Sequence, residues 1–190
     1  MSASSLYSKI LRAALFVVVA LIYSISNSCG NSNSYSYPRE LVVADSLCET
    51  NPPKAISHLK ALRVKSKSMG TADFWYYRLL CVKARDKAYI PAPDVNEPQA
   101  IVNHYESFGA DKSKLHYAYY YLGCAYRDLD NIPMALEFYK KALTIVADKN
   151  SKFASAVNFQ TGFQLLEQSF YKEAMNYFRE SLRIETMYHN

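Results

Sequence analysis

The sequence predicts an all-α fold, a solenoid of about three to four helical hairpins after an N-terminal signal segment. Two observations support this class. Apolar residues within 115–146 recur at helical spacing on both sides of a short polar turn. The same layout then returns further along the chain, because Gly123 and Ala135 are followed by Gly162 and Ala174 at equal offsets. A single hairpin cannot bury its apolar face, so such repeats are expected to stack.

The strongest predicted hairpin spans residues 115–147. The turn between its two helices falls at Asp130-Asn131, which are good N-cap residues. Pro133 follows in the first turn of the second helix, where its missing N–H costs nothing. Gly123 lies in mid-helix, where glycine costs roughly 1 kcal/mol relative to alanine. We expect this cost to be accepted because the bare backbone lets Ala135 of the second helix approach closely.

Seven residues of this hairpin have the spacing W-x2-L-G-x2-Y followed by A-x3-F, with Tyr in place of Trp and of Phe: Tyr119, Leu122, Gly123, Tyr126, Ala135, Tyr139 and Ala142. The pattern resembles the tetratricopeptide repeat (TPR). A second copy at residues 155–186 keeps Gly162, Ala174 and Phe178, and weaker copies cover 40–64 and 71–108. The resemblance implies a helical solenoid, here residues 39–190, with a role in protein binding.

In TPR proteins the first helices of successive hairpins line a concave groove that holds a peptide or another helix. The resemblance therefore implies a set of groove residues in this chain: Tyr76, Tyr117, Tyr120, Arg127, Asp128, Phe159 and Phe163. Tyrosine and arginine give large contact areas at low entropic cost. The alternative is that the tyrosines pack on the adjacent repeat and that the phenylalanines belong to the core.

Residues 1–28 read as a signal peptide. A basic start precedes an uncharged apolar run at 13–25, which is short for a membrane-spanning helix and typical of a signal peptide. Ser28-Cys29 resembles a bacterial lipobox, which implies lipidation of Cys29. The alternatives are an ordinary signal peptide cut after Ser28 and an uncleaved anchor. Residues 29–38 are small and polar, and we expect them to form a flexible tether.

The sequence predicts no catalytic, metal or cofactor site. The four histidines, at 58, 104, 116 and 189, lack the spacing of metal ligands, and no pair of cysteines has the C-x2-C spacing. The formal net charge of +5 is too mild to indicate nucleic-acid binding. These observations do not by themselves exclude an enzyme, but they favour a binding protein.

We therefore expect a non-catalytic scaffold or adaptor, exported and anchored by lipid at the bacterial cell envelope, facing the periplasm or the surface. Its partner would be a protein or peptide held in the groove, with no nucleic acid involved. One alternative is the sensor portion of a truncated membrane-associated TPR regulator, and another is an accessory glycan- or nutrient-binding lipoprotein. The last helix should leave an open apolar face that would admit a partner or a second copy: Tyr177, Phe178, Leu182 and Ile184.

Overall fold

The computed structural model describes residues 35–107 and 109–189. The chain divides into two units, residues 1–36 and 37–190, and every described helix belongs to the second unit. The predicted signal peptide at 1–28 and the lipidation site Cys29 lie outside the described residues. Among the residues that are described, no helix is both long and apolar enough to cross a membrane.

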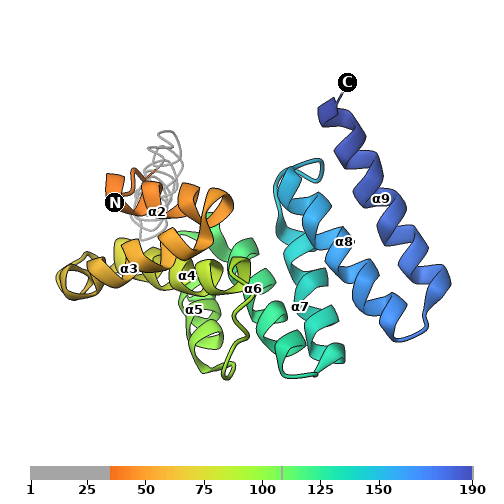
Figure 1. The fold of residues 1–190 in the computed structure, drawn as a ribbon, viewed down its shortest axis with the longest axis horizontal. Coiled ribbons are helices and arrows are strands. Elements are labelled where there is room, and N and C mark those ends of the chain that lie inside the picture. Colours follow the sequence, from red (N-terminus) through yellow and green to blue (C-terminus); the bar gives the residue numbers. More distant parts are fainter. Residues whose placement is uncertain (1–34, 108, 190) are drawn as a thin grey trace, which may run out of the picture. The chain divides into compact units, whose positions relative to one another are not determined.

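The second unit is entirely helical in its described part, which confirms the predicted all-α class (Figure 1). In that part of the chain, consecutive helices pair into four hairpins that follow one another in chain order (Figure 1). The helices are α2 (Arg39–Thr50), α3 (Pro52–Ser66), α4 (Thr71–Lys87), α5 (Asn96–Glu106), α6 (Leu115–Asp128), α7 (Ile132–Ile145), α8 (Lys152–Glu167) and α9 (Tyr171–His189), with a short 3-10 turn η1 (Lys112–Lys114) before α6.

The predicted turn of the strongest hairpin is present between α6 and α7. Asn131 caps α7, because its side chain accepts a hydrogen bond from the Met134 N–H at 3.3 Å. Pro133 lies in the first turn, as predicted. Asp130 differs from the predicted cap, since it adopts a left-handed backbone with φ of 58°.

Gly123 and Gly162 lie where two helices come closest. A Cβ atom added at Gly123 would lie 2.7 Å from two ring carbons of Tyr139 and 3.1 Å from the carbonyl oxygen of Ala135. At Gly162 it would lie 2.9 Å from the ring of Phe178 and 3.2 Å from the carbonyl oxygen of Ala174. The two hairpins therefore share one contact at equivalent positions, as the equal offsets in the sequence predict.

The remaining repeat-defining residues form the interior of this contact. Leu122, Ala135, Tyr139 and Ala142 have no exposed surface, and Ala174 has 1%. Tyr119 and Tyr126 are half-buried and pack on α7, where the Tyr126 ring stacks on Phe138 at 5.6 Å between centroids.

Three first helices end in the same way. Tyr89 after α4, Asp130 after α6 and Ser169 after α8 all have positive φ, at 56°, 58° and 64°. In each case the next N–H bonds to the carbonyl five residues earlier: Ile90 to Arg85, Asn131 to Tyr126 and Phe170 to Leu165. This is the Schellman arrangement, which normally places glycine at the left-handed residue. Its recurrence puts α4–α5 in the same repeat register as the two later hairpins.

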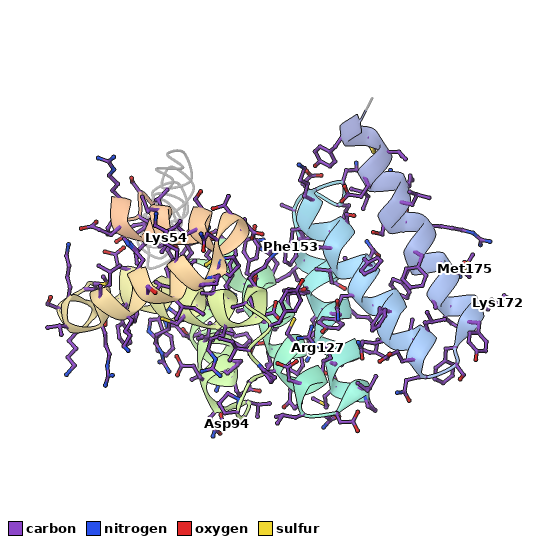
Figure 2. The ribbon with its side chains drawn as sticks, in the orientation of Figure 1. Lys54, Asp94, Arg127, Phe153, Lys172 and Met175 are labelled. Carbon is purple, nitrogen blue, oxygen red and sulfur yellow. The ribbon has the colours of Figure 1, made fainter. Side chains whose placement is uncertain are left out.

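Each first helix packs on the hairpin before it: α4 on α2 and α3, α6 on α4 and α5, and α8 on α7. Helix α4 contacts both α2 and α6. Between α6 and α8 the contact is aromatic, since Phe153 of α8 meets the rings of Tyr117 at 4.7 Å and Tyr120 at 5.6 Å (Figure 2). The stack therefore presents α4, α6 and α8 along one side.

The expected tether at 29–38 does not remain free along its whole length. Tyr37 packs its ring against Tyr76 with centroids 4.1 Å apart, and its hydroxyl donates to Asp111 at 3.4 Å. The folded unit therefore begins at Tyr37, slightly before the predicted start at residue 39, because an aromatic side chain in the polar segment finds a packing site.

Candidate functional site

A groove of about 570 Å³ runs between the C-terminal parts of α4, α6 and α8. It is lined at one edge by Tyr89, Ile90 and Pro91, which follow α4, and at the other by Phe163 and Glu167 of α8. The end of α6 contributes the part of the lining called here the floor, which includes Asp128 and Arg127, the latter labelled in Figure 2. This is the side on which the resemblance to TPR proteins places a binding groove.

The floor of the groove is a fixed ion-pair network. The Arg127 guanidinium donates to Asp86 of α4 at 3.0 Å and to Asp128 at 2.7 Å. The second oxygen of Asp128 accepts from the Ala92 N–H at 2.8 Å. Burial by itself would lower the pKa of Arg127, but its neighbours, both carboxylates among them, reverse this and raise it. Arg127 and Asp128 thus hold α4, α6 and the connection 88–95 together.

The rim is exposed and chemically different from the floor. Tyr89 is 94% exposed, and Phe163 keeps 40% of its surface. Asp130 and Glu167 are exposed as well and make no ion pair within the described residues. A bound segment would therefore meet aromatic surface and free carboxylates at the rim rather than Arg127.

The lining carries more negative than positive charge. It holds four carboxylates, at Asp86, Asp128, Asp130 and Glu167, against two cations, Lys87 and Arg127. Lys87 is itself paired with Glu49 at 2.7 Å. The groove therefore favours cationic groups in whatever occupies it.

The structure divides the seven predicted groove residues. Four of them line the groove: Tyr120, Arg127, Asp128 and Phe163. Tyr120 is largely covered, because it packs on Tyr121, Tyr139 and Phe153. Phe159 is 54% exposed but lies outside the lining, with its ring 5.6 Å from Phe178.

Tyr76 and Tyr117 belong to a second, tightly packed cluster on α4 and α6. Tyr76 is only 4% exposed and donates its hydroxyl to Asp45 of α2 at 2.7 Å. The Lys114 ammonium lies 4.8 Å from the centre of the Tyr76 ring and 5.8 Å from that of Tyr117. These tyrosines join hairpins, which is the alternative that the sequence left open for Tyr117.

Lys83 is the buried charge of this cluster. Its ammonium is paired with Asp45 at 2.6 Å and Glu49 at 2.7 Å. Burial alone would lower the pKa of Lys83, but the two carboxylates raise it above its ordinary value. The same bonds overcome the effect of burial on Asp45 and Glu49, and the pKa of each is lowered. The ion pairs tie α2 to α4.

A smaller cavity of about 130 Å³ lies beside the connection 90–94. It shares Asp86, Ile90 and Asp128 with the lining of the groove. Its other walls include Val82, Pro98 and Tyr121. Within the described residues, no group of three or more His, Cys, Asp or Glu side chains could hold a metal ion.

Comparison with known protein families gives a match in the α6–α7 hairpin. Residues 116–146 match the tetratricopeptide repeat family. Together, this match and the hairpin geometry support a TPR protein. A solved structure described as the crystal structure of MamA is similar over 79% of this chain and 78% of that chain, with 20% identity and a TM-score of 0.48. No curated protein matches the chain.

The TPR pattern did not predict the most exposed groove residue, Tyr89. The pattern marks side chains that pack within a hairpin, whereas Tyr89 lies after α4 in a connection, 88–95, that is longer than the corresponding turns at 129–131 and 168–170. Pro91 and Pro93 indicate a connection but not its direction. The left-handed cap without glycine gave no signal in the sequence.

Proposed function

We propose that this chain is a non-catalytic protein-binding scaffold at the bacterial cell envelope, which holds a segment of a partner in the groove between α4, α6 and α8. The observation that carries the proposal is the groove itself, with exposed aromatic side chains at its rim and an excess of carboxylates. TPR proteins generally act as scaffolds of this kind, and the match at 116–146 supports that role.

The groove indicates the chemistry of the segment that it holds. Tyr89, Ile90 and Phe163 offer apolar contact area, while Asp130 and Glu167 offer acceptors for an ammonium or guanidinium group. Large, rigid aromatic side chains at a rim contribute strongly to binding. The occupant is therefore a peptide segment with apolar residues and at least one lysine or arginine.

The groove also supports a binding role rather than a chemical one. Its half-buried charged groups, Arg127, Asp86 and Asp128, are paired with one another at 2.7 to 3.0 Å. Groups held in this way fix the backbone and are not available to transfer a proton to a bound molecule.

The test uses the left-handed position of Tyr89. Replacing Tyr89 with Gly removes the exposed ring and relieves a backbone conformation that costs a non-glycine residue about 1 kcal/mol. The variant should be at least as stable as the wild type and yet lose its partner. Ser169→Gly is the matched control, because Ser169 has the same left-handed backbone after α8 but does not line the groove.

Partner capture is measured with a photo-crosslinking amino acid at position 91, an exposed site in the groove lining, in the full chain expressed in cells. We expect one crosslinked segment, basic in composition, that is lost with Tyr89→Gly and kept with Ser169→Gly. A crosslinker at Ile145, which is exposed on α7, should not capture that segment. Equal capture from positions 91 and 145, or capture that survives Tyr89→Gly, would refute the groove as the binding site.

The envelope location is a separate part of the proposal and rests on the sequence around Cys29. Metabolic labelling with an alkyne-bearing fatty acid should mark the wild-type chain in the membrane fraction. Cys29→Ala should remove the label. A labelled Cys29→Ala variant, or an unlabelled wild type, would reject lipidation at this residue.

A further inference from the structure

The last hairpin exposes an apolar surface on both of its helices, called here the α8–α9 face. It consists of Phe159, Phe163 and Leu166 on α8 and of Met175, Phe178 and Leu182 on α9. The spacings are those of one helical stripe on each helix, and the Phe159 and Phe178 rings join the two stripes at 5.6 Å. Met175 lies at the outer edge of α9 with Lys172 nearby (Figure 2).

Two of the four predicted members of the open face, Tyr177 and Ile184, are not part of it, and Tyr177 is half-buried. Ile184 is fully buried and packs with Val146 and Ala154, so it belongs to the contact between α9 and the preceding helices. Leu182, by contrast, is 64% exposed. The face is therefore present, but on a different side of α9 from Ile184.

The preceding hairpin shows what this surface does when it is covered. The equivalent positions one repeat earlier, at the offset that relates Gly123 to Gly162, are Tyr120, Cys124 and Arg127 on α6 and Leu136, Tyr139 and Leu143 on α7. All of these are buried or half-buried. Tyr120 packs on Phe153 of α8, whereas Arg127 is covered from α4, where Asp86 accepts its hydrogen bond. Within the described residues no element packs on the α8–α9 face in the same way. The α8–α9 face is therefore the apolar counterpart of a surface that is largely covered in the preceding hairpin.

The α8–α9 face is complementary to itself. A copy turned by half a rotation about an axis parallel to the helices places the stripe of α9 against that of α8. The charges named below, which lie at the flanks of the two stripes, are then opposite in sign. Glu167 lies exposed at the end of α8, and Lys172 and Arg179 lie exposed on α9. Self-complementary patches of this kind produce closed two-fold dimers.

The dimensions of the face are sufficient for a dimer of modest affinity. With a rise of about 1.5 Å per residue and helix axes about 10 Å apart, the hairpin surface is roughly 25 Å by 20 Å. Pairing two copies would bury on the order of 1,000 Å² in total, which is the lower limit for a specific interface. Aromatic side chains at the centre of the patch strengthen such an interface.

We propose that two copies of this chain pair through the α8–α9 face, with α8 of each copy against α9 of the other. The pairing extends the solenoid core across the two-fold axis. Phe163 lines the groove as well as this face, so the pairing covers part of the groove edge on α8 and leaves the opposite edge at Tyr89.

The test is sedimentation equilibrium of the full chain in a density-matched mild detergent, over a range of protein concentrations. We expect a monomer–dimer equilibrium. Leu182→Glu and Met175→Lys should each raise the dimer dissociation constant by about 100-fold, because either sign of charge must lose its water in the interface. The control is Val64→Glu, which places the same carboxylate on α3 at a residue that is 83% exposed.

Circular dichroism is the check that each variant keeps its helices, which is the result expected for changes at exposed positions. A dimer that Leu182→Glu and Met175→Lys weaken and Val64→Glu leaves intact supports the proposal. A wild type that remains monomeric, or a dimer that the α9 variants do not weaken, would overturn it.

Discussion

Replacement of Gly123 by alanine tests the central packing contact of the chain. In an isolated helix this change is stabilising by roughly 1 kcal/mol, because glycine loses more backbone entropy. Here the added Cβ would lie 2.7 Å from the Tyr139 ring and 3.1 Å from the Ala135 carbonyl oxygen. Tyr139 is fully buried and its hydroxyl contacts the Cys124 sulfur at 3.7 Å, so the ring has no free space to enter.

The expected net effect is a loss of stability. Overpacking a fixed interior costs about 1 to 3 kcal/mol, and more when backbone must move. Because the added Cβ meets both a buried ring and a backbone oxygen, we expect a cost in the upper part of this range, about 2 to 3 kcal/mol. After subtraction of the helix propensity gain of about 1 kcal/mol, Gly123→Ala should destabilise the chain by roughly 1 to 2 kcal/mol, which corresponds to a fall of about 2 to 8 °C in Tm. Gly162→Ala is the matched comparison. Its neighbour Phe178 is only half-buried and can swing outward, so the change should be close to neutral.

The assay is urea and thermal unfolding followed by circular dichroism at a helical wavelength. Tyr139→Leu in the Gly123→Ala background should recover part of the loss, because the branched side chain vacates the space of the ring edge. A Gly123→Ala variant as stable as the wild type, or a Gly162→Ala variant more damaged than Gly123→Ala, would refute this account of the contact.

The ion pairs and a buried imidazole lead to three further expectations. Asp128→Ala should lower the free energy of unfolding in urea by about 2 to 3 kcal/mol, because it removes one of the two carboxylates paired with Arg127 and the acceptor of the Ala92 N–H. In the wild type the pKa of Asp45 is lowered, so its contribution to the free energy of unfolding is present above about pH 4 and is lost below it. Because Lys83 is one cause of this shift, Lys83→Met should move the midpoint of acid unfolding to higher pH. Burial lowers the pKa of His116 to about 4, so stability should fall as pH drops from about 6.5 to 4, and His116→Phe should flatten Tm over that range.

The fold was predictable because its signals are local in the sequence. Apolar residues at helical spacing, a capping Asn131 and a glycine facing a small residue define a hairpin by themselves. Repetition of that hairpin then requires stacking, since one hairpin leaves its apolar face in water. The contact of Gly123 with Tyr139 in the structure is the one that this spacing implies.

The groove was predictable as a place but not as a set of side chains. The repeat pattern located it on the first helices, and Tyr120, Arg127, Asp128 and Phe163 do line it. Which of these is open to a ligand depends on contacts between hairpins. Arg127 of α6 meets Asp86 of α4, and Tyr120 of α6 meets Phe153 of α8. No local spacing encodes such pairs.

The sequence by itself determined the helices, their pairing and the repeat register, because each depends on residues close together along the chain. Only the tertiary structure decided which aromatic side chains are exposed. Tyr76 became a buried bridge between helices, while Tyr89 was left at the rim by an irregular connection and a left-handed cap. Exposure depends on how successive hairpins are rotated against one another, and that rotation is fixed by long-range packing rather than by any single repeat.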